Sequence, residues 1–154
     1  MPDALEPRPR VILIVDDEPD ILESLRDLFS VAIPNATCIT AGSGAEGLKR
    51  LQEAPVDLIL SDYKMPGMDG LQFLQEARRV APRVARILIT AFPDLEVAIR
   101  AINEAGIETF FTKPLDPDGV VKTVNNALES RHAREMRDQA LARALDLRKK
   151  AGGP

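Results

Sequence analysis

The feature that most constrains this 154-residue chain is a repeated alternation between short apolar runs and amphipathic segments. The five apolar runs, most of them rich in β-branched or aromatic residues, are "VILIV" (11–15), "ATCIT" (36–40), "VDLILS" (56–61), "ARILIT" (85–90) and "ETFFT" (108–112). Runs that are apolar throughout are typical of strands covered on both faces. The intervening segments, and the one after the last run, carry apolar residues at helical spacing. This alternation predicts an α/β fold with a parallel sheet and helices on both of its faces.

The helix ends are indicated by capping residues and by proline. Pro19 stands near the start of the first amphipathic segment, where a helix tolerates proline best. Ser43 and Glu46 have the spacing of a capping box and open a short second helix. Gly106 is a good C-cap for the fourth helix, and the fifth is expected to start around residues 116–117.

The length fits one domain with little left over, so we divide the chain into three parts. Residues 1–10 are expected to be a flexible leader, residues 11–130 the compact domain, and residues 131–154 a helical extension with a flexible end. One uninterrupted helix could run from Asp118 to Lys149, since only Gly119 would weaken it. Its distal half carries a narrow, alanine-rich stripe that fits either a coiled-coil seam or a solvated linker helix: Ala133, Met136, Ala140, Ala144 and Leu147.

The charge is divided unevenly along the chain. Residues 1–130 hold 13 Lys/Arg against 21 Asp/Glu, whereas residues 131–154 hold 7 against 3. An acidic body argues against a broad nucleic-acid surface, and the basic tail alone would give only weak, salt-sensitive binding. The single cysteine excludes an internal disulfide and fits a reducing compartment. With no apolar run long enough for a membrane span, we expect a cytoplasmic protein.

Polar residues follow the predicted strands. Asp16 and Asp17 follow the first strand, Asp62 the third, Thr90 ends the fourth, and Lys113 follows the fifth. In an open α/β sheet the binding crevice lies beyond the carboxyl ends of the strands, so we expect these groups to converge at one edge.

Three carboxylates this close cannot all stay ionised without compensation. One ammonium offsets one charge, and a divalent cation could offset the rest. Oxygen ligands without histidine or cysteine favour Mg²⁺. A cation and an ammonium beside a carboxylate also suit that carboxylate to attack a phosphoryl group, giving an acyl phosphate.

The motifs "VDDE", "SDYKMPGMDGL", "LIT" and "FFTKP", in this order and spacing, resemble the receiver domain of two-component response regulators over roughly residues 10–130. The resemblance implies a flavodoxin-like, doubly wound sheet of strand order 2-1-3-4-5. It makes Asp62 the phosphoacceptor. It further implies that Asp17 and Asp62 bind Mg²⁺ directly, that Asp16 acts largely through water, and that the backbone carbonyl of Lys64 is another metal ligand.

The same resemblance assigns the remaining site residues. Thr90 would hydrogen-bond the phosphoryl oxygens, Lys113 would pair with them, and the Lys113–Pro114 bond would be cis. Phe110 matches the family's switch aromatic, which turns inward when the threonine moves. That movement would change the face made by helix four, strand five and helix five. Phe92, two residues past Thr90, would shield the phosphoryl group from water, which predicts slow autodephosphorylation.

A histidine kinase or phosphotransfer protein would supply the phosphoryl group. The output would be an effector, a downstream domain, or a homodimer formed through the helix 4–strand 5–helix 5 face or the C-terminal helix. On this interpretation the chain catalyses only its own phosphorylation and dephosphorylation and is not an enzyme.

Two other functions fit less well. A haloacid-dehalogenase-type phosphatase needs an Asp-x-Asp after its first strand and usually a cap domain, whereas Asp16 and Asp17 are adjacent and there is no room for a cap. For a DNA-binding regulator, the 24 residues after residue 130 are too few for a helix-turn-helix domain.

Overall fold

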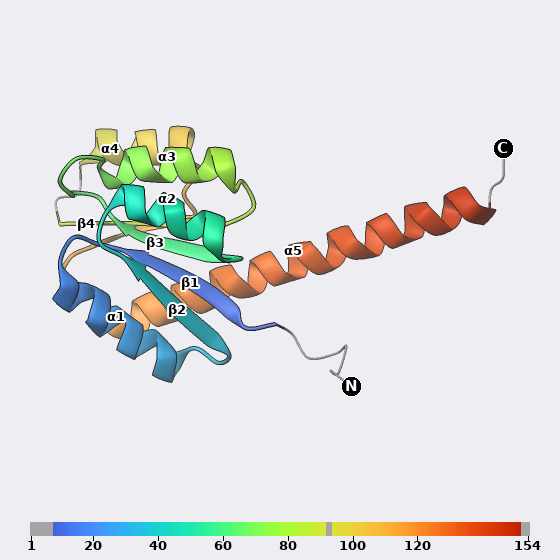
Figure 1. Cartoon of the computed structure of the whole chain (residues 1–154), viewed down its shortest axis with the longest axis horizontal. Helices are drawn as coiled ribbons and strands as arrows, with labels where there is room; N and C mark the ends of the chain where they lie inside the picture. Colours follow the sequence, from blue (N-terminus) through green and yellow to red (C-terminus); the bar gives the residue numbers. More distant parts are fainter. Residues whose placement is uncertain (1–7, 92–93, 152–154) are drawn as a thin grey trace.

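The sheet has five parallel strands in the order β2-β1-β3-β4-β5, as seen in a computed structural model that describes residues 8–91 and 94–151. Strands and helices alternate along the chain (Figure 1). The strands are β1 (Arg10–Val15), β2 (Ala36–Ala41), β3 (Leu58–Asp62), β4 (Ala85–Thr90) and β5 (Thr109–Thr112). The helices are α1 (Pro19–Ala32), α2 (Gly44–Glu53), α3 (Gly70–Val80), α4 (Leu95–Arg100), the π-helix η1 (Ala101–Ala105) and α5 (Pro117–Ala151). The predicted fold class and strand order are confirmed.

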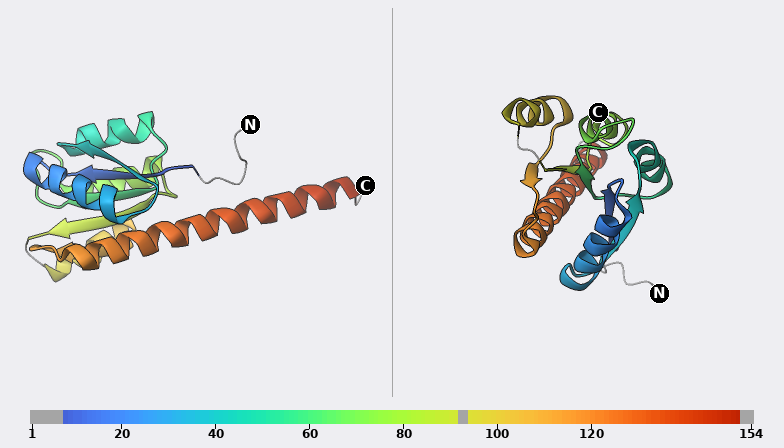
Figure 2. Two further views of the ribbon diagram at one scale, coloured as in Figure 1. Left: turned by 90° about the horizontal axis from the view of Figure 1, so that it is seen from below. Right: turned by 90° about the vertical axis from the view of Figure 1, so that its left-hand side faces the viewer.

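Helices cover both faces of the sheet, and each face has its own core. Figure 2 shows α1 and α5 on one side and α2, α3 and α4 on the other. Along β1 the side chains alternate: Ile12 and Ile14 join the core under α1 and α5, while Leu13 and Val15 join the core under α2 and α3. Because both faces are packed, the middle strands read as continuous apolar runs in the sequence.

Helix capping follows the predicted signals with one difference. The Ser43 hydroxyl accepts a hydrogen bond from the backbone N–H of Glu46 at the start of α2. The Glu46 carboxylate, however, accepts from the N–H of Gly42 instead of that of Ser43. A reciprocal capping box is found instead at α3, between Asp69 and Gln72.

The fourth helix is less regular than predicted. Its α-helical part ends at Arg100, and residues 101–105 form one π-helical stretch before Gly106 terminates the element in the left-handed conformation, with φ of 59°. Ala101 and Ala105 are both buried, so the wider turn keeps two small side chains on the core. Gly106 is therefore the cap that the sequence indicates, at the end of a different helix type.

The bounds of β1 and α5 can be compared with the predicted division of the chain into three parts. Strand β1 begins at Arg10 and Arg8 is already bonded to the domain, so only residues 1–7 of the expected leader lie outside the described residues. At the other end, α5 is one helix of 35 residues that continues without a break through residues 130 and 131. The boundary between domain and extension thus falls inside a helix, and the three-part division stays a prediction.

Helix α5 changes character along its length. Val120, Val124 and Leu128 are buried against the sheet, whereas the distal part projects beyond the domain (Figures 1 and 2). The distal side chains of Ala140, Ala144 and Leu147 from the expected stripe are exposed, and those of Ala133 and Met136 lie outside the described side chains. Within residues 8–91 and 94–151, no helix combines the length and apolar character needed to cross a membrane.

Candidate functional site

The carboxyl ends of β1 and β3 bring three carboxylates together. Asp16 directly follows β1 and is 1% exposed, and Asp62 is the last residue of β3 and is 6% exposed. Asp17 lies next to Asp16 and is exposed. Carboxylate oxygens of these three residues lie within 4.8 Å of one another. The predicted convergence of Asp16, Asp17 and Asp62 at one edge of the sheet is therefore present.

Strands β4 and β5 bring a hydroxyl and an ammonium to the same edge. Lys113 Nζ lies 3.3 Å from Asp62 Oδ1 and 3.8 Å from Asp16 Oδ2. The backbone N–H of Lys113 donates to the carbonyl of Thr90, the buried last residue of β4, at 2.9 Å. The Lys113–Pro114 peptide bond is cis, as the resemblance implied. Thr90 and Lys113 thus lie at the same end of the sheet as the acidic cluster.

Burial and the charges of neighbouring carboxylates make Asp16 and Asp62 hard to ionise. Burial raises the pKa of Asp16 to about 6, with a further increase from the charge of Asp62 and a partial offset from the hydrogen bond that the Glu18 N–H donates. Burial also raises the pKa of Asp62, against the opposing charge of Lys113. Burial works against the charged form of Lys113, but the carboxylates of Asp62 and Asp16 outweigh it and raise its pKa.

The acidic cluster has too few positive charges and hydrogen-bond donors to compensate its three carboxylates. Three carboxylates face one ammonium, and within the described part of the chain Asp16 Oδ2 is buried without a hydrogen-bond partner. An orphaned, buried carboxylate oxygen costs free energy unless a cation or a donor reaches it. The donor set is all oxygen, which suits a hard divalent cation such as Mg²⁺. The residues present therefore fit a Mg²⁺ ion.

The loop after Asp62 is pressed tightly against the end of β3. The Tyr63 N–H donates to the carbonyl of Ile89 at 2.7 Å, and the Gly70 N–H donates to the carbonyl of Tyr63 at 2.6 Å. A Cβ added to Gly70 would lie 2.0 Å from the backbone oxygen of Asp62, so only glycine fits there. Lys64, in this loop, has an exposed side chain. Sequence reasoning missed Gly70, although an Asp-Gly pair after a turn was available as a signal.

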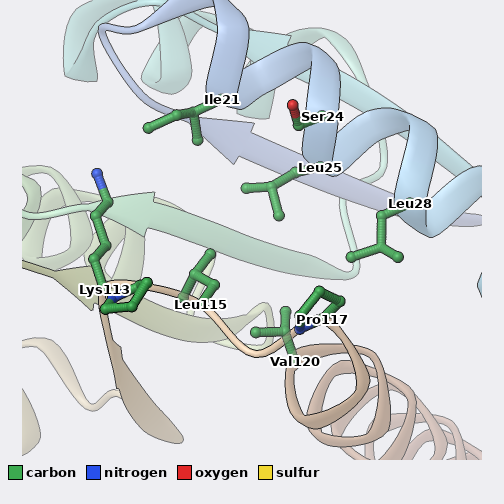
Figure 3. Close-up of a pocket in the computed structure, with 9 residues that line it drawn as sticks. Ile21, Ser24, Leu25, Leu28, Lys113, Leu115, Pro117 and Val120 are labelled. Carbon is green, nitrogen blue, oxygen red and sulfur yellow. The ribbon is translucent and has the colours of Figure 1, made fainter.

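Next to Lys113 the surface is hollowed by a cavity of about 510 Å³ between α1 and the loop that leads into α5. Figure 3 shows Ile21, Leu25 and Leu28 of α1 on one side, and Leu115 and Val120 on the other. Lys113 stands at one end of this cavity with its amine directed toward the acidic cluster. An apolar hollow therefore adjoins the charged site.

Two further predicted residues lie around the site. Phe110, on β5, is 38% exposed, so its ring is not fully packed into the core. Phe92 lies outside the described residues, and the prediction of slow autodephosphorylation stays a prediction.

Comparison with known proteins agrees with the geometry. A family model for the response regulator receiver domain matches residues 12–125. The transcriptional regulatory protein GlrR of Escherichia coli (strain K12) is 37% identical over 122 residues, which are 79% of this chain but 27% of that protein. The DNA-binding transcriptional regulator NtrC of the same organism is 35% identical over 120 residues, which are 77% of this chain and 24% of that protein. The chain therefore spans only a small part of the length of these curated relatives.

Solved structures agree as well. The signal receiver domain of an HD domain-containing protein from Pseudomonas fluorescens Pf-5 is 33% identical with a TM-score of 0.80, over 89% of this chain and 99% of that one. A response regulator receiver domain protein from Clostridium thermocellum is 31% identical with a TM-score of 0.74, over 80% of this chain and 98% of that one. With the family model matching most of the sequence and the same sheet order in the fold, this chain belongs to the receiver domain family of response regulators.

Proposed function

We propose that this receiver domain accepts a phosphoryl group on Asp62 in a Mg²⁺-dependent reaction and that the modification controls a partner, dimerisation or a downstream domain. The observation that carries the proposal is the position of the Asp62 carboxylate. It lies 3.3 Å from the Lys113 ammonium and within 4.8 Å of oxygens of Asp16 and Asp17. A nucleophilic carboxylate and the groups that would neutralise transferred charge are therefore neighbours.

The proposed transfer is a displacement at phosphorus. An oxygen of Asp62 attacks the phosphorus of a phosphohistidine, a P–O bond forms, and the P–N bond breaks with its electron pair remaining on the imidazole nitrogen. The Lys113 ammonium neutralises charge on the phosphoryl oxygens, and the Thr90 hydroxyl donates a hydrogen bond to one of them. Burial of Asp62 and Thr90 strengthens these interactions, since charges attract more strongly where water is excluded.

The metal would be held by the carboxylates of Asp16, Asp17 and Asp62 and by the backbone carbonyl of Lys64. When bound, Mg²⁺ supplies positive charge that offsets the negative phosphoryl oxygens. The buried Oδ2 of Asp16, which accepts no hydrogen bond within the described residues, and the raised pKa of Asp16 and Asp62 support this assignment. Burial makes ionisation of these carboxyl groups costly, and a bound cation would offset that cost.

Phosphorylation would be transmitted through Thr90 and Phe110 to the face formed by α4, β5 and α5. Phe110 is exposed on β5 and would turn inward in the active arrangement, and η1 begins directly after α4. The face also carries exposed apolar side chains at Ile99 and Ile102. A packed core tends to switch between discrete arrangements, so a small shift of Thr90 can be converted into a change of surface.

The partners we propose are a histidine kinase or phosphotransfer protein as donor and an effector or output domain as receiver of the signal. The relatives named as transcriptional regulators are much longer than this chain and support a cytoplasmic signalling role. A solved structure of the beryllofluoride-activated NtrC4 receiver domain is described as a dimer, which supports a homodimer as one possible output. The only reaction we assign to the domain is on its own Asp62.

The test is phosphorylation by a small phosphodonor, followed by intact-mass measurement. With Mg²⁺ and acetyl phosphate, the chain should gain the mass of one phosphoryl group, and the gain should disappear with EDTA or in Asp62→Asn. The matched control is Asp27→Asn, which removes an exposed carboxylate on α1 and should leave phosphorylation unchanged. Modification that persists in Asp62→Asn would contradict the assignment of the acceptor.

The switch needs a separate measurement. Hydrogen exchange should change on residues 95–112 when beryllofluoride and Mg²⁺ are added to the wild type, and not when they are added to Asp62→Asn. An unchanged α4–β5–α5 face in the wild type would leave the acceptor chemistry intact and refute this output surface.

A further inference from the structure

A second group of charged residues lies at the opposite edge of the sheet, before the strands begin. Asp57 directly precedes β3 and is 5% exposed. Arg8 precedes β1, Arg83 precedes β4 and Glu108 precedes β5. Helix α5 passes this edge and adds Arg131, Arg134, Glu135 and Asp138, which help to line a cavity of about 280 Å³ there. This edge has no part in the proposed phosphorylation.

Asp57 is the centre of this group because each of its carboxylate oxygens accepts two hydrogen bonds. Arg8 binds it in a bidentate way, with Nη1 donating to Oδ2 at 2.9 Å and Nη2 donating to Oδ1 at 2.5 Å. The Val11 N–H donates to Oδ2 at 2.8 Å, and Arg131 Nη1 donates to Oδ1. Four hydrogen bonds use the acceptor capacity of one carboxylate, so this buried charge is fully compensated.

Arg131 is the residue by which α5 reaches Asp57. Its side chain is 11% exposed, its Nε donates to the carbonyl of Arg83 at 2.8 Å, and its Nη1 lies 3.0 Å from the Glu135 carboxylate. Arg131 thus contacts the segment before β4, Asp57 and its own helix, and the charges of Arg8, Asp57, Arg131 and Glu135 sum to zero. We call these four residues the Asp57 clasp.

We propose that the Asp57 clasp fastens residues 131–138 of α5 to the domain and so fixes the direction in which the rest of the helix projects. The apolar attachment of α5 ends with Leu128, and the next side chain of the helix that the domain covers is that of Arg131, which is 11% exposed, while residues 129, 130 and 132 are exposed. An isolated helical extension is marginal in water, because helix stability in proteins comes mainly from tertiary contacts. The clasp supplies such a contact one turn beyond the apolar core.

Two outer ion pairs continue the same attachment. Arg83 Nη1 lies 3.0 Å from the Asp138 carboxylate, and Arg134 lies 3.9 Å from Glu108. Both pairs are exposed and are expected to contribute little on their own. Among the described residues, Asp138 is the furthest along α5 with an ion pair to the domain, and the end of the helix projects beyond the domain (Figure 2).

The clasp also joins the beginning of the chain to the helix. Arg8 is bonded to Asp57 and Arg131 is bonded to the same Asp57 oxygen. Removing Arg8 leaves Asp57, Arg131 and Glu135 with one uncompensated negative charge. A change at Arg8 should therefore affect the extension of α5 through Asp57. If the extension were held only by its own helix propensity, a change at Arg8 would have no effect on it.

The first test is hydrogen exchange on the full chain without Mg²⁺ or phosphodonor. In the wild type, amides 131–138 should exchange more slowly than amides 142–151. Arg131→Ala should speed exchange at 131–138 by at least about tenfold, the factor that one charge-assisted hydrogen bond contributes. Arg8→Ala should act on the same amides in the same direction. The matched control is Arg137→Ala, an exposed arginine on the same helix, which should leave these amides unchanged.

The second test measures direction. Spin labels at Val31→Cys and Leu147→Cys, which are 89% and 60% exposed, in a Cys38→Ala background report the distance between α1 and the end of α5 by double electron–electron resonance. A fixed helix gives a narrow distance distribution, and Arg131→Ala should broaden it while Arg137→Ala should not.

Two results would overturn the proposal. One is equal exchange of amides 131–138 and 142–151 in the wild type. The other is unchanged exchange and an unchanged distance distribution in both Arg131→Ala and Arg8→Ala, with acetyl phosphate still modifying both variants as proof that they fold.

Discussion

Replacing Asp16 with asparagine should stabilise the metal-free protein, although Asp16 is a residue of the proposed site. The pKa of Asp16 is about 6 in the fold, raised mainly by burial, against an ordinary value of 3.8. A carboxyl group whose pKa is raised by folding binds more protons in the folded state, so stability falls as the pH rises from about 4 to about 6. The full difference corresponds to about 3 kcal/mol above this range.

Asp16→Asn removes this cost because an amide does not ionise. Its Oδ1 can still accept the hydrogen bond that Glu18 donates, but its amino group would replace the oxygen that lies 3.8 Å from the Lys113 ammonium, so two donors would face each other. We therefore expect a net gain of about 1–3 kcal/mol at pH 7, after subtracting the cost of an unpaired polar group. Below about pH 4 the wild-type acid is itself protonated and neutral, so the gain should disappear there.

The assay is urea unfolding in EDTA at several pH values between 4 and 7.5, with wild type, Asp16→Asn and the exposed-carboxylate control Asp27→Asn. The difference between Asp16→Asn and wild type should grow as the pH rises, whereas Asp27→Asn should show no such growth. In Mg²⁺ the difference should shrink, because the wild type gains binding free energy that the variant loses in part. A stability difference that is the same at pH 4 and pH 7 would refute the view that burial of an ionised Asp16 destabilises the fold.

Three further outcomes test other parts of the structure. Lys113→Ala should raise the pKa of Asp62 further, as measured by NMR, and should slow phosphorylation by acetyl phosphate by about a hundredfold, because the nearest positive charge is lost. Gly70→Ala should lower the free energy of unfolding by about 1–3 kcal/mol in a urea titration, because its methyl group would collide with the Asp62 carbonyl. Leu128→Ala should cost about 2–4 kcal/mol, while Leu145→Ala should stay within about 0.5 kcal/mol, because only the first is buried.

The site was predictable from sequence because its residues mark the ends of strands. Asp16, Asp62, Thr90 and Lys113 each end or directly follow an apolar run, and parallel strands bring such ends together by topology alone. No side-chain contact had to be foreseen. Burial of both sheet faces made the runs easy to find, whereas the strand order, the cis Lys113–Pro114 bond and the role of Phe110 needed the family resemblance.

The features that sequence did not indicate depend on contacts between distant residues. Arg131 lies 74 residues from Asp57, and no periodicity in the helix distinguishes it from the exposed Arg137. The amino-acid composition of the π-helical turn after Arg100 does not distinguish it from an α-helix, since Ala101 and Ala105 would suit an α-helix equally well. The contact of Arg131 and the helix type of residues 101–105 both depend on which residues the segment packs against. The local sequence pattern carries no information about those residues.

Strand β3 shows how the same residue type acquires opposite roles at its two ends. Asp57 and Asp62 flank one apolar run, and both are nearly inaccessible to solvent. Asp57 accepts hydrogen bonds from Arg8, Val11 and Arg131, so its charge is compensated and the residue holds elements together. Asp62 shares a single ammonium with Asp16, and burial raises the pKa of Asp62 against the opposing charge of Lys113, so its charge is less well compensated. A buried carboxylate that its neighbours satisfy has no need of a ligand, whereas one left short of positive charge favours binding of a cation. The balance of charge around each aspartate, more than its burial or its position on a strand, therefore separates the structural carboxylate from the proposed phosphoacceptor.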